Sequence, residues 1–274
     1  MESIASASPL LSSTQAAAML GVHAASVKRW SDQGKIKCIR TPGGHRRFLR
    51  SEIEAIRRAP EDTPEAFLER LLQALVSGSQ MTAEGELLSH WGESGRWERV
   101  GDTIGILLEN MGQAWRDGTM LISEEHIASE TLLRSIARLN TMMPHRPNAP
   151  VCALATAPGD EHTIGLAMSE LVLAEHDWRT LWLGRNCPVE TLIEVIQRPG
   201  VDMLALSASS FSNTPALLGK LLRTIGPVAL ATNTQIILGG SGAWPQSVFG
   251  VQRVRSYEEF GQFLRGQRSE RLAQ

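Results

Sequence analysis

Beyond residue 150 the sequence alternates between short aliphatic runs and amphipathic stretches, and this repetition restricts the chain to one class of fold. The aliphatic runs read as buried strands; they cover residues 151–157, 180–183, 203–207, 235–238 and 251–255. Stretches with helical spacing follow them, at residues 164–174, 189–196, 215–225 and 258–264. Such alternation predicts an α/β domain over residues 150–268, with a doubly wound, Rossmann-like parallel sheet.

Polar residues and glycines follow three of these strands. Asp160-Glu161-His162 comes after the first strand, Ser207 ends the third, and Gly239-Gly240 ends the fourth. Because the carboxyl ends of parallel strands share one edge, where ligands bind, these loops are predicted to line one crevice. In the pattern D-x-H-x-x-G, which ends at Gly165, a neutral His162 can coordinate a metal and Asp160 can accept its other ring N–H. A hydrogen-bonded loop histidine without a ligand is the alternative interpretation of His162.

Four helices are predicted in residues 64–143, ahead of this domain. Apolar residues repeat at helical spacing in four stretches, which start near Phe67, Leu87, Val100 and Ile127. Short connections between such stretches predict a compact four-helix bundle. Trp91 and Trp97 are expected in its core.

One tryptophan of the bundle stands apart. Trp115 is followed by Arg116-Asp117-Gly118, which ends the third helix, and an aromatic ring at a helix end can lie across a ligand. Glu125 and His126 come in the first turns of the fourth helix, for which Ser123 is the expected N-cap. A carboxylate there is also favoured by the helix dipole, so a purely structural Glu125 is an open alternative.

The first sixty residues differ from the rest in charge. Residues 1–59 hold ten Lys/Arg against four acidic residues, a net charge of +6, while the remainder carries −8. A basic head on an acidic body is typical of a nucleic-acid-binding module, although a merely solvated basic face gives the same composition. Proline-rich junctions separate the segments, at residues 59–64 and 143–150. The predicted organisation is a flexible tail over residues 1–11, a head over 12–60, the bundle over 64–143 and the sheet domain over 150–268.

The head contains the elements of a winged helix-turn-helix. Ser13-Thr14-Gln15 opens a first short helix, Gly21 is the turn, and residues 24–33 form a second helix. Residues 36–40 and 45–48 flank the turn Thr41-Pro42-Gly43-Gly44 as a β-hairpin wing. Two short helices joined by a glycine turn predict a module whose second helix enters the major groove.

This segment resembles the DNA-binding domain of the mercury-resistance (MerR) regulators. The resemblance rests on Thr14-Gln15-Ala16-Ala17, on Val27-Lys28-Arg29-Trp30 and above all on Thr41-Pro42-Gly43-Gly44-His45-Arg46-Arg47-Phe48. It implies that double-stranded DNA is contacted by Lys28, Arg29, His45, Arg46 and Arg47. For His45, a hydrogen bond that stabilises the turn is an equal alternative.

The sheet domain resembles the cobalamin-binding domain of corrinoid methyltransferases and mutases. The resemblance rests on D-x-H-x-x-G at 160–165, with Ser207 forty-two residues after Gly165 and Gly239-Gly240 about thirty residues further on. It implies that His162 ligates cobalt, that Ser207 hydrogen-bonds the displaced nucleotide tail, and that Gly165, Gly239 and Gly240 leave room for that tail. The family's S-x-L is here Ser207-Ala208-Ser209.

Taken in order, the three segments resemble the light-responsive, adenosylcobalamin-dependent regulators of the CarH/LitR type. Their W-x9-E-H motif corresponds to Trp115, Glu125 and His126, which by this resemblance pack on the adenosyl group, hydrogen-bond its ribose and line the same pocket. The resemblance implies a non-enzymatic photoreceptor and repressor, a homotetramer on operator DNA in the dark. Family members carry a histidine directly after the tryptophan, where this chain has Arg116.

Two other functions compete with this interpretation. One is a regulator that senses cobalamin, or another upper ligand, without light. The other is a corrinoid carrier for a methyltransferase, which the basic head argues against. The three cysteines, Cys38, Cys152 and Cys187, are widely spaced and predict neither a zinc site nor a disulfide framework. With no signal segment or membrane span predicted, a cytoplasmic protein is expected.

Overall fold

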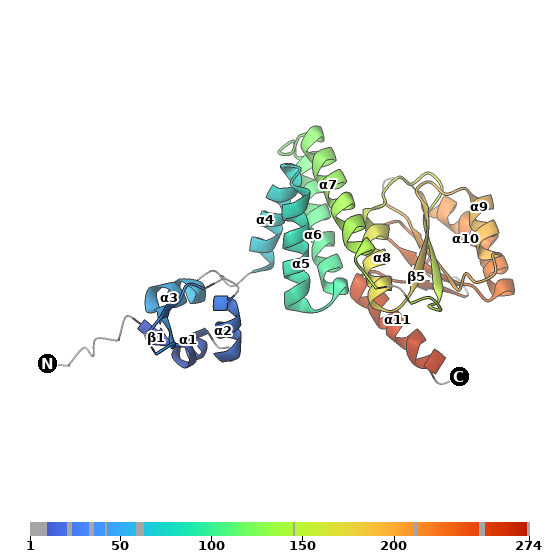
Figure 1. Cartoon of the computed structure of the whole chain (residues 1–274). Helices are drawn as coiled ribbons and strands as arrows, with labels where there is room; N and C mark the ends of the chain where they lie inside the picture. Colours follow the sequence, from blue (N-terminus) through green and yellow to red (C-terminus); the bar gives the residue numbers. More distant parts are fainter. Residues whose placement is uncertain are drawn as a thin grey trace. The chain divides into compact units, whose positions relative to one another are not determined.

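A computed structural model describes residues 10–20, 24–32, 36–41, 43–58, 63–144, 146–210, 213–246 and 250–272. The chain divides into two compact units, Met1–Ala66 and Phe67–Gln274 (Figure 1). None of the helices in the described part of the chain has the length and apolar character needed to cross a membrane.

The first unit is a small helical domain with a three-stranded antiparallel sheet. The strands lie in the order β1 (Leu10–Ser12), β3 (Arg46–Leu49), β2 (Ile39–Arg40). Helices α1 (Ser13–Leu20), α2 (Ala24–Asp32) and α3 (Arg50–Arg58) accompany them. The core holds Leu11, Ala16, Ala17, Val27, Ile36, Phe48 and Ile53. The two predicted helices and the hairpin are confirmed.

The limits of this unit differ from the prediction. Strand β1 starts at Leu10, so a tail over residues 1–11 is wrong for its last two residues: Leu11 pairs with Phe48 and is 2% exposed. Helix α3 was not predicted; its buried residue Ile53 packs into the same core. The predicted turn at Gly21 lies outside the described residues.

The second unit begins with the predicted four-helix bundle. Its helices are α4 (Pro64–Val76), α5 (Gln80–Ser94), α6 (Trp97–Arg116) and α7 (Ile122–Thr141). Helix α5 ends at Gly95, whose φ of 67° is a left-handed conformation that glycine adopts without strain. Apolar residues from all four helices fill the interior, among them Phe67, Leu71, Leu87, Ile104, Leu132 and Ile136.

Two predicted details of the bundle are wrong. Trp97 is buried as expected, but Trp91 is 36% exposed: it stacks on Trp97 and its indole N–H donates to Glu175 Oε1 at 3.2 Å. Helix α7 does not begin at Ser123. Its N-cap is Leu121, whose backbone N–H donates to the Glu124 carboxylate at 2.8 Å.

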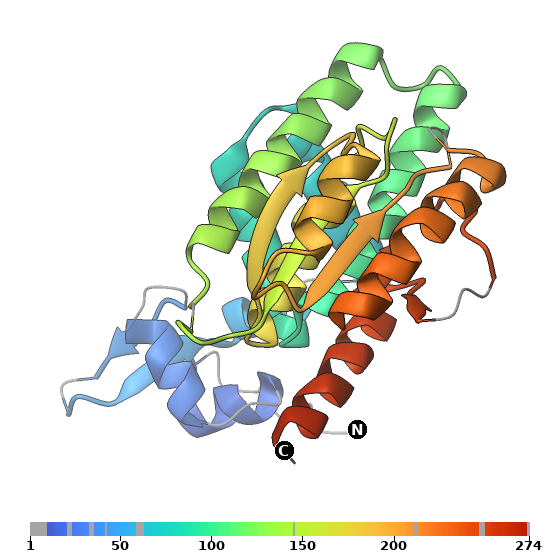
Figure 2. The same ribbon diagram turned by 90° about the vertical axis from the view of Figure 1, so that its right-hand side faces the viewer.

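A five-stranded parallel sheet follows, in the order β5-β4-β6-β7-β8. The strands are β4 (Val151–Thr156), β5 (Arg179–Gly184), β6 (Met203–Ser207), β7 (Gln235–Gly239) and β8 (Val251–Arg253). Helices α8 (Ile164–Glu175) and α11 (Tyr257–Leu272) cover one face, while α9 (Val189–Ile196) and α10 (Pro215–Thr232) cover the other and lie in front in Figure 2. The predicted doubly wound sheet is confirmed. Helix α10 is longer than predicted because it continues through Pro227.

The bundle and the sheet domain share one hydrophobic core. Residues of α6 and α7 pack with those of α8 and α11. At the edge of this contact the Glu98 carboxylate of α6, only 1% exposed, accepts hydrogen bonds from His176 Nε2 at 2.7 Å and Arg265 Nη1 at 2.5 Å. The carboxylate fits because α11 has a glycine opposite it: a Cβ at Gly261 would lie 1.7 Å from Glu98 Oε1. A buried ion-pair network therefore holds three helices together.

Gly261→Ala should destabilise this contact, because the added methyl group displaces a buried, hydrogen-bonded carboxylate. We expect a loss of about 1–3 kcal/mol in the free energy of unfolding of the second unit. Gly266→Ala, in the same helix but with no atom near its Cβ position, is the matched control. It should be neutral or stabilising by up to about 1 kcal/mol. Urea unfolding followed by tryptophan fluorescence measures both; equal behaviour of the two variants would contradict the tight packing.

Candidate functional site

The order of the strands places one crevice in the sheet. The chain winds to one side from β4 to β5 and to the other side from β6 onward, so the switch point lies between β4 and β6. The loops that follow these two strands diverge there, and ligands of such sheets bind at this point. The first loop carries Asp160 and His162, and the second starts after Ser207.

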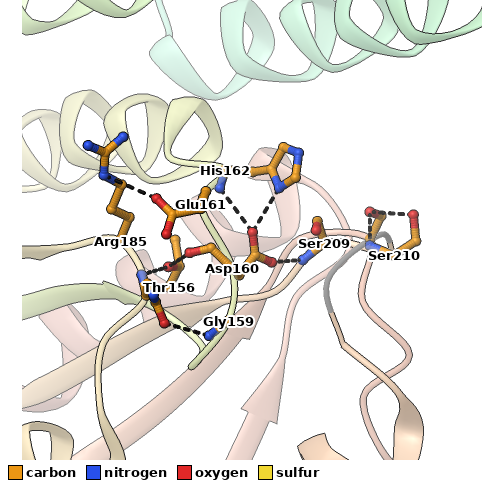
Figure 3. Close-up of polar contacts among 10 residues, drawn as sticks. Thr156, Gly159, Asp160, Glu161, His162, Arg185, Ser209 and Ser210 are labelled. Carbon is orange, nitrogen blue, oxygen red and sulfur yellow. Dashed lines mark hydrogen bonds and ion pairs between the residues drawn. The ribbon is translucent and has the colours of Figure 1, made fainter.

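Asp160 connects the two loops (Figure 3). Its side chain is fully buried and accepts three hydrogen bonds. Oδ1 accepts the backbone N–H of His162 and bonds to the ring Nδ1, each at 2.9 Å, and Oδ2 accepts the backbone N–H of Ser209 in a short hydrogen bond. The Asp160 backbone carbonyl accepts the N–H of Asn186 at 2.8 Å and a short hydrogen bond from the hydroxyl of Thr156. The aspartate is thus a fixed part of the switch point.

The Asp160 carboxyl is held in its charged form. Burial alone would raise its pKa, but the hydrogen bonds from His162 and Ser209 outweigh burial and keep the pKa below its usual value. A carboxylate can only accept, so Nδ1 of His162 must be the donor. In a neutral imidazole the lone pair then lies on Nε2, the form that ligates metals.

His162 itself is exposed over 61% of its side chain. In Figure 3 its ring points up from Asp160, toward the green ribbon of the bundle at the top of the view. The predicted pair Asp160–His162 is therefore brought together. Ser209, which completes the arrangement through its backbone, was missed because a backbone donor leaves no side-chain signal in the sequence.

The predicted glycines have different surroundings. A Cβ at Gly239 would meet no atom within 4 Å, so this position faces open space. A Cβ at Gly240, where φ is 78°, would lie 2.3 Å from the Ala208 carbonyl oxygen and 2.8 Å from Ser207 Oγ. The absence of a side chain at Gly240 thus lets its backbone lie close to Ser207 and Ala208, and does not leave room for a nucleotide tail. Gly165 is also in contact, since its carbonyl accepts the Tyr257 hydroxyl at 3.0 Å.

The residues predicted on the bundle lie at the turn between α6 and α7. Trp115, in the last turn of α6, is 48% exposed. In the first turns of α7, Glu125 Oε2 bonds to His126 Nδ1 at 2.7 Å, and Glu125 Oε1 accepts the Ser129 hydroxyl at 2.7 Å. The His126 side chain is 74% exposed. These three side chains therefore present an aromatic ring, a carboxylate and an imidazole at one end of the bundle.

Two contacts fix the direction in which α6 runs along α8. Near its start Glu98 bonds to His176, which follows the last residue of α8. One turn later Asp102 accepts the N–H of Tyr257, whose hydroxyl reaches Gly165 in the first turn of α8. The two helices are therefore antiparallel. From Glu98 to Trp115 the rise is about 25 Å, against about 18 Å for the whole of α8. The end of α6 that carries Trp115 thus passes the N-terminal end of α8, where the His162 loop ends.

The first unit carries the predicted DNA-contacting residues on α2 and the hairpin. Lys28 and Arg29 are exposed on α2. Arg46 is largely enclosed and pairs with Asp32 at 2.5 Å, whereas Arg47, its neighbour in β3, points to the opposite face of the sheet. His45 is exposed, and its backbone N–H donates to Thr41 Oγ1 at 3.2 Å, so the turn is stabilised through the backbone.

Comparison with known proteins agrees with this architecture. Residues 10–59 match the helix-turn-helix domain family. The HTH-type transcriptional repressor CarH of Myxococcus xanthus is 24% identical over 232 residues, covering 70% of this chain and 76% of that protein. The dimethylamine corrinoid protein of Methanosarcina barkeri is 22% identical over 184 residues, covering 65% of this chain and 85% of that protein.

Among solved structures, the monomethylamine corrinoid protein of Methanosarcina barkeri superposes with a TM-score of 0.57 at 14% identity, covering 73% of this chain and 98% of that one. The bundle and the Rossmann-like domain therefore form a fold that this corrinoid protein shares. In this chain a helix-turn-helix domain stands ahead of that fold, and the chain as a whole is similar to CarH.

Proposed function

We propose that this protein is a cobalamin-dependent transcription regulator, and that its cofactor is adenosylcobalamin and its signal light. The observation that carries the proposal is the imidazole of His162, oriented by a buried, ionised Asp160 at the switch point of the sheet. The helix-turn-helix domain would bind DNA. The similarity to CarH supports a role in transcription, and the similarity to a corrinoid protein supports a cobalamin cofactor.

The residues at the sheet edge fit a corrinoid. His162 would ligate cobalt through Nε2, because Asp160 binds Nδ1 and fixes the tautomer. The open space beside Gly239 and the hydroxyl of Ser207, at the end of the neighbouring strand, suit a nucleotide tail that passes between helix and sheet. Gly240 would act indirectly, by letting β7 end close to Ser207.

The other face of the corrin would be covered by the bundle. Trp115 would pack on the adenosyl group, Glu125 would accept hydrogen bonds from its ribose, and His126 would line the same space. Bound adenosylcobalamin supplies a cobalt–carbon bond that light can break. The end of α6 and the start of α7 would then respond to the presence or absence of the adenosyl group. The homotetramer loaded with cofactor in the dark would be the form that represses transcription.

The assembly state should decide DNA binding. A single head makes few phosphate contacts and binds weakly at physiological salt, whereas heads held together gain effective concentration on repeated half-sites. We expect the purified protein with adenosylcobalamin to elute as a tetramer in the dark and as a smaller species after green light, with a matching change in absorption. Assembly without a light response would instead indicate a light-independent cobalamin sensor.

Residue 116 should not ligate cobalt in the state reached after illumination. Its guanidinium donates to Gln113 Oε1 at 2.8 Å, and a guanidinium offers only donors, so it cannot take the upper face of cobalt. The illuminated protein should carry water or His126 there, or lose the cofactor. Absorption spectra of Arg116→Ala after illumination should match those of the unaltered chain; a difference in cobalt coordination would contradict this prediction.

The wing should bind DNA mainly through Arg47. Since Arg46 is paired with Asp32, Arg47→Gln should lower the salt dependence of affinity by about one unit in the log–log slope, the contribution of one phosphate contact. Arg46→Gln is the matched control and should change the slope less. Fluorescence anisotropy on a DNA duplex at several salt concentrations measures both. If even the double variant has the slope of the unaltered protein, the wing does not contact phosphates.

A second function draws support from the corrinoid proteins themselves, since the chain behind its first unit shares a fold with one of them. A methyl-carrying corrinoid protein would turn over methyl donors in the presence of a methyltransferase. The exposed basic residues of α2 and the helix-turn-helix domain favour the regulator. Methyl transfer without any DNA binding would favour the carrier.

A further inference from the structure

Tyr257, the only tyrosine in the chain, lies where three helices of the second unit meet. It is the first residue of α11, and its hydroxyl donates to the Gly165 carbonyl oxygen in the first turn of α8 at 3.0 Å. Its ring packs on α6 so closely that a Cβ at Gly101 would lie 2.6 Å from Cδ2. Tyr257 therefore contacts both α6 and α8 from α11.

Asp102 of α6 completes the connection. Its two oxygens accept the backbone N–H groups of Tyr257, at 2.7 Å, and Glu258, at 3.2 Å. A carboxylate from one helix thereby caps the N-terminus of another, where the helix dipole favours negative charge. Partial burial nevertheless raises the pKa of Asp102, and the two hydrogen bonds offset only part of this effect. The cap is thus a specific contact between α6 and α11, one turn after the buried Glu98 network.

We propose that Asp102 and Tyr257 are positioning residues that link the bundle to the segment carrying His162. The path runs from α6 through the Asp102 carboxylate and the Tyr257 hydroxyl to Gly165, three residues after His162. Thirteen residues after Asp102, the same helix carries Trp115. A displacement of α6 is therefore passed to the first turn of α8 through two side chains, without opening the core. The positioning of His162 rests on the proposed function; the link itself does not.

Hydrogen exchange in the cofactor-free, full-length protein tests the link. The backbone amides of residues 167–169 bond to the carbonyls of residues 163–165, at the start of α8, so they report opening of its first turn. Tyr257→Phe keeps the ring on Gly101 and removes only the hydroxyl, and Asp102→Ala removes the cap. Each should speed exchange at residues 167–169 about fivefold, as expected for one lost hydrogen bond. Thr224→Val is the control: it removes a hydroxyl that bonds to Lys220 within α10, on the other face of the sheet.

The double variant separates a link from two independent contacts. If Asp102 acts through Tyr257, the double variant should exchange at the same rate as either single variant. Multiplied effects, or an effect of Tyr257→Phe without one of Asp102→Ala, would overturn the link. Unchanged exchange in all variants would overturn it too.

Binding of hydroxocobalamin tests the positioning of His162. Tyr257→Phe and Asp102→Ala should each weaken binding about threefold, within the range of coupling seen for such networks, and the lower-ligand absorption should be retained. Faster exchange with unchanged affinity would leave the link intact and overturn its role in positioning His162. No cobalamin binding by the unaltered protein would overturn the proposed function, while the exchange results would still decide the link.

Discussion

Replacing His162 by alanine should remove the absorption of base-off, His-ligated cobalamin and weaken binding about 100-fold. The expected loss is large because second-sphere partners of metal-binding histidines alone are worth about 10- to 100-fold in affinity. The fold should survive, since the His162 side chain is 61% exposed and the buried Asp160 keeps its bond to Ser209. Titration of hydroxocobalamin followed by absorption measures both the affinity and the ligand.

Glu161→Gln is the matched control for this experiment. Glu161 is the neighbouring residue in the same loop and its exposed carboxylate pairs with Arg185 at 3.2 Å. Its loss changes the charge of the loop without touching the imidazole, so the spectrum and the affinity should stay close to those of the unaltered protein. If His162→Ala binds as tightly and with the same spectrum, His162 is a hydrogen-bonded loop histidine and the proposed metal site is wrong.

The sheet domain could be predicted from the sequence because its central strands β4, β6 and β7 are largely buried on both faces. Such strands appear as short aliphatic runs, and all five strands begin within one residue of the predicted position. Strand β8 ends two residues earlier than predicted. The ends of helices were harder. Helix α10 passes through Pro227 because its apolar face, including Ile225 and Ala229, packs on the sheet across the proline.

The candidate site could be predicted only where side chains carry the chemistry. Asp160 and His162 are two residues apart, and their contact follows from local loop geometry. Ser209 contributes through its backbone N–H, which any residue type could supply. Tyr257 lies on a helix that is 92 residues away from Gly165 in the sequence. Gly240 illustrates the same limit: the sequence shows that a side chain is absent, whereas only the packing against Ala208 shows what the absence is for.

For Glu125 and Trp115 of the bundle, a structural role has to be weighed against a role in ligand binding. Glu125 is bonded to His126 and Ser129 and lies in the first turns of α7, where a carboxylate is stabilised by the helix dipole. A role in helix stability therefore accounts for Glu125 without any ligand. The helix dipole offers no such account of Trp115, because an indole carries no charge, and 48% of the residue is left exposed. Replacing Trp115 therefore tests more directly than replacing Glu125 whether this end of the bundle binds a ligand.

Trp115→Ala should reduce adenosylcobalamin binding about tenfold or more and abolish the assembly that it drives, while binding of hydroxocobalamin changes little. Stacking of a base on an aromatic side chain is worth about 1–3 kcal/mol, and hydroxocobalamin has no adenosyl group to stack. Glu125→Ala should show the same selectivity through the lost contact with ribose. Absorption titrations with both cobalamins, followed by size-exclusion chromatography in the dark, measure the difference.

Two variants with matched chemistry control for nonspecific effects. Trp182→Ala removes an indole of similar exposure, 41%, from the edge strand β5, and Glu130→Ala removes an exposed carboxylate one turn further along α7, paired with Arg134. Both should bind the two cobalamins as the unaltered protein does. If Trp115→Ala and Glu125→Ala also assemble normally with adenosylcobalamin, the end of the bundle does not cover the cofactor. The antiparallel course of α6 along α8 would then serve only to pack the two domains, and the exposed face of Trp115 would need another partner.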